Sequence, residues 1–85
     1  MRAVTIYTTT YCAYCVRAKA ILTKEGVPFV EQDVTHDDAK RTWLVETTGS
    51  RTVPQIFFDA EPIGGCDDLE AIVRKGALKE KLHAV

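Results

Sequence analysis

Two cysteines, Cys12 and Cys15, lie three positions apart in the segment YCAYC, and this spacing allows several kinds of chemistry. The pair could form a structural disulfide, supply half of a zinc site, or cycle between dithiol and disulfide as a redox centre. In the first turn of a helix, side chains at i and i+3 lie on one face, so the two sulfurs could close a small disulfide ring. The spacing permits redox chemistry, and the rest of the chain must favour one interpretation.

Cysteine count and expected location argue against the first two interpretations. The chain has three cysteines, an odd number, and its first residues, MRAVTIY, are too short and too soon followed by threonines to form a signal peptide. We therefore expect a cytosolic protein, and structural disulfides are rare in that reducing compartment. A zinc site would need two further ligands, but Cys66, His36 and His83 form no second pair with metal-ligand spacing. A redox centre is the favoured interpretation.

The two cysteines are expected to have unequal roles. A helix predicted to begin near Cys12 would place that sulfur at its amino terminus, where unpaired backbone N–H groups and the helix dipole favour a thiolate. Arg17 and Lys19 follow closely and could add positive potential. Because the thiolate is the attacking species, Cys12 is predicted to be the nucleophile and the more buried Cys15 the resolving thiol.

The elements that must position these cysteines can be predicted from hydrophobic periodicity and turn residues. Short β-branched and aromatic runs predict strands at residues 3–7, 28–34 and 52–59, and a brief fourth strand after a turn formed by EPIGG. Helical spacing predicts helices at 12–26, from an N-cap at Thr35 to Gly49, at 66–76 and over the tail 77–85. This order predicts an α/β fold with a four-stranded mixed sheet flanked by helices.

Length and charge limit the classes of function. With 85 residues, the chain is expected to form a single domain that spans residues 1–85. Its 46% hydrophobic content is typical of a globular protein without a membrane span. Its formal net charge of −1 offers no electrostatic attraction for nucleic acid or an anionic membrane. A small molecule or a protein is therefore the expected substrate.

Three segments, YCAYC, TVPQIF and GGCDDL, resemble in order and spacing the dithiol glutaredoxins, and most of all the bacterial glutaredoxin 3 group. The resemblance covers essentially the whole chain. It implies a thioredoxin-like fold and a glutathione-dependent thiol-disulfide oxidoreductase that reduces protein-glutathione mixed disulfides and protein disulfides. Glutathione would be the co-substrate, regenerated by NADPH through glutathione reductase, and the protein would act as a monomer in the cytoplasm.

The same resemblance implies a glutathione site next to Cys12. The Val53–Pro54 bond would be cis, and the backbone of Val53 would pair with the cysteine part of glutathione. Free N–H groups at the start of the predicted third helix would hold the γ-glutamyl carboxylate, and Arg41 and Arg51 would bind the glycine carboxylate. The residues implied in binding are Tyr14, Arg41, Arg51, Thr52, Val53, Pro54, Gly65, Cys66 and Asp67.

Several of these residues also have a simpler interpretation. Pro54 could be trans and merely open a strand, and the arginines could be solvated surface charges. Asp67 could meet the ammonium of glutathione, or it could cap the helix in a capping box with Glu70. Cys66 could contribute only its backbone, or its thiol could be a site of regulatory oxidation.

Two positions depart from the pattern of the family. Many dithiol members have proline where this chain has Ala13, and relatives often carry a lysine at the position of Thr9. Some relatives without that proline hold a 2Fe-2S cluster between two protomers, through the first cysteine and glutathione. Cluster binding is therefore one alternative function. Direct reduction by thioredoxin reductase is another, although the GGCDD segment and the arginines favour glutathione as the reductant.

Overall fold

The computed structural model describes residues 1–83, so residues 84–85 of the predicted tail helix lie outside the described residues. The strands are β1 (Val4–Thr8), β2 (Val30–Asp33), β3 (Gln55–Phe58) and β4 (Glu61–Gly64). The helices are α1 (Ala13–Lys24), α2 (Asp38–Thr48), α3 (Cys66–Arg74) and α4 (Leu78–Leu82). One sheet has the order β2-β1-β3-β4, with β2 parallel to β1 and the other neighbours antiparallel. The predicted four-stranded mixed sheet is confirmed.

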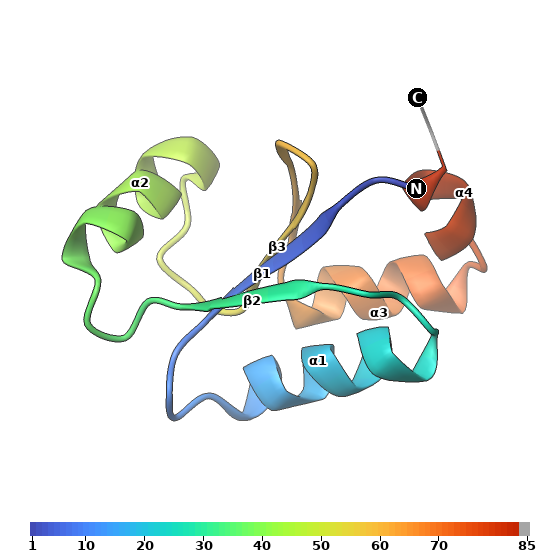
Figure 1. The fold of residues 1–85 in the computed structure, drawn as a ribbon, viewed down its shortest axis with the longest axis horizontal. Helices are drawn as coiled ribbons and strands as arrows, with labels where there is room; N and C mark the ends of the chain where they lie inside the picture. Colours follow the sequence, from blue (N-terminus) through green and yellow to red (C-terminus); the bar gives the residue numbers. More distant parts are fainter. Residues whose placement is uncertain (84–85) are drawn as a thin grey trace.

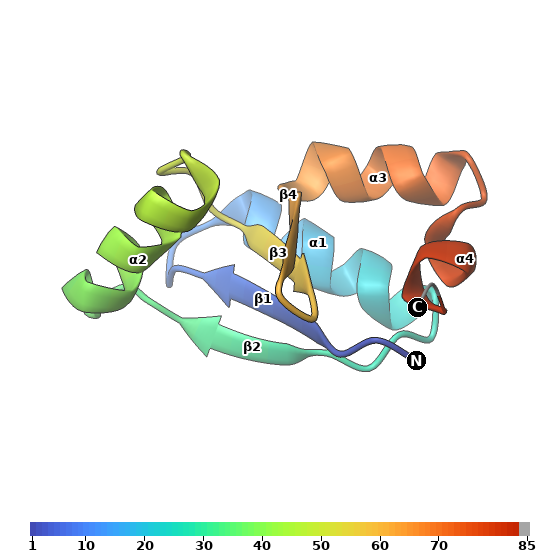
Figure 2. The ribbon, with the colours of Figure 1, turned by 90° about the horizontal axis from the view of Figure 1, so that it is seen from above.

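Helices lie on both faces of this sheet (Figure 1). α1 and α3 lie side by side on one face and begin at the same end of it, whereas α2 lies toward the other face, as Figure 2 also shows. The central strand β1 is buried between them because its side chains alternate between two cores: Ile6 belongs to the larger core and Tyr7 to the smaller. β1 ends at Thr8, directly before the loop that carries Cys12.

The larger core holds α1 and α3 against the sheet. Ile6, Leu22, Phe58, Leu69 and Leu82 come from five different elements, and each is at most 1% exposed. Burial of a side chain of this size contributes about 1.5–3 kcal/mol relative to exposure. The amino ends of the two helices are therefore placed by a well-packed interior, although both ends lie near the surface.

The smaller core holds α2. Leu44 of α2 packs with Tyr7 and Phe57 of the strands. The ring of Trp43 lies 5.7 Å from that of Tyr7 and 5.6 Å from that of Phe57, and the two strand rings are 5.4 Å apart. These distances lie within the range of favourable aromatic pairs, so the aromatic contacts fix the helix that carries Arg41.

The predicted N-cap of the second helix is wrong. Asp37 caps α2, because its Oδ1 accepts a hydrogen bond from the backbone N–H of Lys40 at 2.9 Å. The hydroxyl oxygen of Thr35, the predicted cap, instead accepts a hydrogen bond from the backbone N–H of Thr10 at 2.8 Å. Thr35 therefore binds the loop before Cys12, a long-range contact that a capping pattern does not reveal.

Two predicted strand boundaries also need correction. The segment EPIGG was predicted to be a turn, but Glu61–Gly64 is β4, and the turn lies at Asp59, whose φ of 54° is in the left-handed region. β3 begins at Gln55 and not at residue 52, because Pro54 has no N–H to donate to a ladder.

Within residues 1–83, no helix is long and apolar enough to span a membrane.

Candidate active site

Cys12 is the N-cap of α1, and its sulfur has polar contacts on two sides. Its backbone is extended, with φ −133° and ψ 106°, and its Sγ accepts a hydrogen bond from the backbone N–H of Cys15 at 3.1 Å. The thiol also donates to the carbonyl oxygen of Val53, 3.6 Å away. The side chain is partly exposed and unpaired with another sulfur. An amide N–H and the positive end of a helix both stabilise a thiolate at this position.

Cys15 lies in the opposite environment. It is 1% exposed. Burial, with a smaller contribution from the neighbouring Cys12 sulfur, raises the pKa of the Cys15 thiol to about 12, although the charge of Lys19 acts in the other direction. Because the desolvated thiolate is unfavourable, Cys15 is protonated at neutral pH.

The cations that follow the cysteines are both paired with carboxylates. The guanidinium of Arg17 lies 2.7 Å from Glu70 of α3, and the ammonium of Lys19 lies 2.9 Å from Glu31 of β2. The sequence predicted that these cations add positive potential at Cys12. Pairing with a carboxylate reduces the positive potential that either cation contributes at Cys12.

A groove of about 380 Å³ lies next to the sulfur of Cys12 and ends at the start of α3. The Val53–Pro54 bond in its wall is cis, as the resemblance implies, and the carbonyl of Val53 contacts the Cys12 thiol. The groove, hereafter the α3 groove, is lined by Tyr14, Thr52, Val53, Pro54, Gly65, Cys66, Asp67 and Asp68. All of these residues except Asp68 were implicated from the sequence.

The amino terminus of α3 presents free donors to the α3 groove. The N-cap is Gly65, whose carbonyl accepts the first helical hydrogen bond, from Leu69. The backbone N–H groups of Cys66 and Asp67 therefore precede the helical ladder and have no partner within it. Such an end is suited to a carboxylate, since the N–H groups and the helix dipole both favour an anion.

Asp67 does not cap α3, so the predicted capping box with Glu70 is wrong. The carboxylate of Asp68 instead accepts a hydrogen bond from the backbone N–H of Gly65 at 2.9 Å. Asp67 is exposed on the rim of the α3 groove. The sequence analysis missed Asp68, although its place three residues after Gly65 is the capping-box spacing and could have identified it.

The two glycines before α3 allow close packing at this point. Gly64 has a φ of 121°, and a Cβ there would collide with the carboxylate of Asp68. A Cβ on Gly65 would lie 3.4 Å from the carbonyl oxygen of Pro54. Small residues at these positions let the start of α3 approach the wall of the α3 groove.

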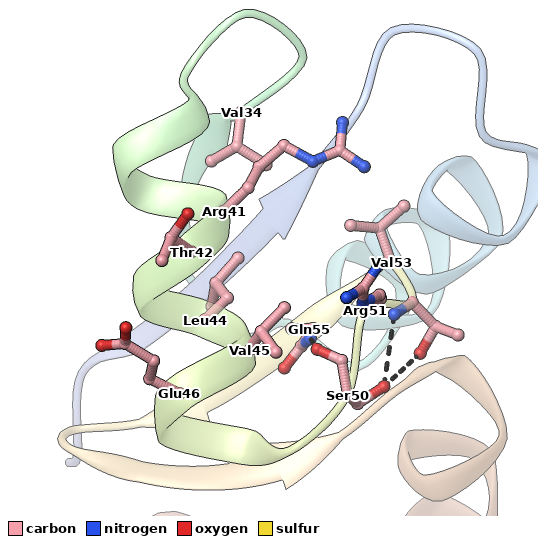
Figure 3. Close-up of a pocket in the computed structure, with 11 residues that line it drawn as sticks. Val34, Arg41, Thr42, Leu44, Val45, Glu46, Ser50, Arg51, Val53 and Gln55 are labelled. Atoms are coloured by element: carbon pink, nitrogen blue, oxygen red, sulfur yellow. Dashed lines mark hydrogen bonds between the residues drawn. The ribbon is translucent and has the colours of Figure 1, made fainter.

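A second groove, of about 490 Å³, adjoins the first and contains the predicted arginines. Figure 3 shows Arg41 extending from α2 and Arg51 lying beside Val53. Thr52 and Val53 line both grooves, so the two are neighbours on this segment, whose Val53 carbonyl contacts the Cys12 thiol. We call the second one the arginine groove. Both arginines are exposed, and each guanidinium can bind a carboxylate in a bidentate manner.

Cys66 lines the α3 groove, but its side chain belongs to the core. It is 4% exposed, and its thiol donates to Oε1 of Glu70 at 3.5 Å. Burial, together with the adjacent Glu70 carboxylate, raises the pKa of the Cys66 thiol. These features favour the interpretation in which Cys66 contributes its backbone, because a buried thiol with a raised pKa is a poor nucleophile.

No group of three or more histidine, cysteine or acidic side chains gathers into a metal site within residues 1–83. Cys12, Cys15 and Cys66 are all free thiols. The zinc interpretation of the cysteine pair therefore has no support in the described part of the chain.

Comparison with known proteins identifies the family. The family model for glutaredoxin matches residues 4–63, more than half of the chain. The chain belongs to the glutaredoxin family. It is 50% identical to glutaredoxin 3 of Escherichia coli K12 over 78 residues, which cover 92% of this chain and 94% of that protein. It is 45% identical to a glutaredoxin of Pseudomonas aeruginosa over 84 residues, 99% of this chain and 100% of the relative.

Solved structures agree with this assignment. A buckwheat glutaredoxin-glutathione complex superposes with a TM-score of 0.88 at 32% identity, covering 95% of this chain and 76% of that one. The solution structure of a Brucella melitensis glutaredoxin gives 0.86 at 43% identity, with 96% and 89% covered. The predicted thioredoxin-like fold is confirmed. As a glutaredoxin, the chain is a glutathione-dependent thiol-disulfide oxidoreductase.

Proposed function

We propose that Cys12 is the nucleophile of this glutaredoxin and that Cys15 is its resolving thiol. The observation that carries this assignment is the contrast between a partly exposed sulfur at a helix N-cap and a buried thiol one turn later. The thiol of Cys12 contacts the carbonyl of Val53, a residue that lines both grooves, whereas Cys15 is buried. A substrate disulfide can therefore reach Cys12 first.

We further propose that glutathione binds along the two grooves. The backbone of Val53 pairs with its cysteine residue, which places the glutathione sulfur beside Cys12 and near the ring of Tyr14. The α3 amino terminus binds the γ-glutamyl carboxylate through the N–H groups of Cys66 and Asp67, while the Asp67 carboxylate binds the ammonium. Arg41 and Arg51 bind the glycine carboxylate at the other end. The α3 groove and the arginine groove share Thr52 and Val53 in their linings, which supports this placement.

The reaction with a protein-glutathione mixed disulfide needs only Cys12. Its thiolate attacks the glutathione sulfur, the bond to the protein sulfur breaks, and the protein leaves as a thiolate that takes a proton from water. Cys12 then carries glutathione in a disulfide. A second glutathione thiolate attacks that glutathione sulfur, which forms glutathione disulfide and releases the Cys12 thiolate.

The reaction with a protein disulfide also needs Cys15. Cys12 attacks one sulfur of the target and forms a mixed disulfide with it. Cys15 loses its proton and attacks the Cys12 sulfur, so the target leaves as a dithiol and a Cys12–Cys15 disulfide forms. Two glutathione molecules reduce that bond and leave as glutathione disulfide.

NADPH and glutathione reductase restore the glutathione pool. The protein acts as a monomer in the cytoplasm, with residues 1–85 as its single domain.

A 2Fe-2S carrier is the alternative that one residue favours, because Ala13 replaces the proline found in many dithiol members. Cys12 is the one cysteine in residues 1–83 with a partly exposed sulfur. A cluster would therefore need Cys12 from each of two chains, with two glutathione molecules as the other ligands. Anaerobic reconstitution with iron and sulfide that yields no visible absorbance would dismiss this alternative.

The test of the proposed function is a coupled assay with NADPH, glutathione reductase, glutathione and a small glutathione mixed disulfide. We expect Cys12→Ser to lose at least about 100-fold in rate, because the other two thiols, Cys15 and Cys66, are buried, and Cys15→Ser to stay active. With a protein disulfide as substrate, both Cys12→Ser and Cys15→Ser should be inactive. A folded wild type without activity would overturn the proposal, and coupling to thioredoxin reductase would then be assayed in place of glutathione.

A further inference from the structure

An ion pair joins the helix that begins after Cys12 to the helix that begins the α3 groove. Nη2 of Arg17 in α1 lies 2.7 Å from Oε2 of Glu70 in α3. The other carboxylate oxygen of Glu70 accepts from the thiol of Cys66, the first residue of α3, at 3.5 Å. Glu70 therefore contacts both helices close to their amino ends while lining neither groove.

These two helix ends hold two parts of the same proposed ligand. The sulfur at the start of α1 reacts with the cysteine residue of glutathione, and the N–H groups at the start of α3 bind its γ-glutamyl carboxylate. The bonds between these parts of glutathione limit the distance that the bound ligand can span. A shift of α3 along α1 would change that distance and force the ligand into another conformation, and small misplacements of reacting groups are costly.

Solvent exposure makes the ion pair more important for geometry than for stability. The Arg17 side chain is 59% exposed and that of Glu70 is 23% exposed. Pairs of this kind contribute little to folding, because water screens the charges and ordering long side chains costs entropy. The large core already holds α1 and α3 together. The pair can therefore set the fine position of α3 without being required for the fold.

We propose that the Arg17–Glu70 ion pair holds the amino terminus of α3 at the distance from Cys12 that glutathione requires. Glu70 is then a positioning residue for glutathione. This inference rests on the proposed function of the two grooves.

The test measures the KM for glutathione and kcat in Glu70→Gln, Arg17→Met and the charge-swapped double variant Arg17→Glu/Glu70→Arg. Each single variant should raise the KM about 3- to 10-fold with kcat within about twofold of wild type, and the swap should restore the KM. Glu70→Gln also removes a negative charge near an anionic ligand. A pure charge effect would lower the KM, so an increase is the signature of positioning.

The chain offers a matched control on the same helix. Lys19 pairs with Glu31 of β2 at 2.9 Å, so Glu31→Gln disturbs an ion pair of α1 that does not reach α3. Its KM for glutathione should equal that of wild type. The inference is overturned if Arg17→Met and Glu70→Gln keep the wild-type KM, if the swap restores nothing, or if Glu31→Gln raises the KM as much.

A binding measurement separates this inference from the proposed function. NMR titration of S-methylglutathione into Cys12→Ser, with and without Glu70→Gln, reports position without turnover. A dissociation constant about 3- to 10-fold higher with Glu70→Gln supports the inference even if the wild type lacks activity, an outcome that would overturn the proposed function alone. An unchanged constant, or no binding to either variant, overturns the inference.

Discussion

Cys12 and Cys15 are three residues apart in one helical turn, yet the two sulfurs lie in opposite environments. Cys12 is partly exposed at the N-cap and accepts the N–H of Cys15, whereas Cys15 faces the core at 1% exposure. The helix end stabilises charge on the first sulfur, and burial opposes charge on the second. A single turn of helix at the edge of a core can therefore make two chemically identical groups functionally different.

The largest expected effect is a difference in alkylation rate between the two thiols. Iodoacetamide should modify Cys12 in the variant Cys15→Ser/Cys66→Ser at least about 100-fold faster than Cys15 in Cys12→Ser/Cys66→Ser at pH 7, because the thiolate is the reactive form. Mass spectrometry of the native proteins over time gives both rates. In urea the two rates should converge, and comparable rates in the folded proteins would contradict the contrast.

A smaller effect should appear in the pH dependence of stability. The pKa of the Cys15 thiol is raised to about 12 in the folded protein, compared with about 8.5 for an unfolded thiol. The stability that the protonated thiol contributes to the fold is therefore fully present below the unfolded pKa and is lost as the pH rises toward 12. The free energy of unfolding of wild type relative to Cys15→Ala should therefore decrease by about 1–2 kcal/mol between pH 7.5 and pH 10. Urea unfolding under reducing conditions measures this difference. A constant difference would mean that Cys15 ionises normally in the folded protein.

The smallest effect is expected from Ala13→Pro, at the first helical position between the two cysteines. Proline is compatible with this position, and the hydrogen bond to the Cys12 sulfur comes from the N–H of Cys15, which the substitution keeps. We expect the free energy of unfolding to rise by about 0.4–1 kcal/mol and the ratio of the two alkylation rates to stay within about twofold. Thermal unfolding and the alkylation assay check both. A collapse of the ratio would show that the N–H of Ala13 also supports the contrast.

The predicted features that proved correct depend on neighbours in the sequence. Cys12 as a helix start follows from its local pattern, and Gly49 ends α2 with a φ of 74°, as its place after the helical run predicts. The first three strands of the sheet were predicted because β-branched and aromatic runs favour extended backbone. Local propensity and tertiary packing agree at these positions.

The predictions that failed depend on partners far along the chain or on competition between nearby groups. Thr35 has the sequence pattern of an N-cap, but its hydroxyl oxygen accepts a hydrogen bond from the backbone N–H of Thr10, and Asp37 caps α2. Asp67 looks like a cap as well, but the N-cap is Gly65, and the carboxylate of Asp68 accepts the hydrogen bond from its backbone N–H. A pattern identifies every residue that could cap a helix, and only the path of the chain selects one.

The sequence by itself determined the fold class and the nucleophile candidate, because spacing along a helix and turn chemistry act over a few residues. The segments of the proposed glutathione site were implied by the resemblance of the chain to the glutaredoxins. Tertiary structure alone decided that the carbonyl of Val53 contacts the Cys12 thiol, that Thr52 and Val53 line both grooves, and that Glu70 joins α1 to α3. These contacts join elements up to 53 residues apart. Side-chain type does not encode such distances, so they become defined only when the cores close and fix the helices against the sheet.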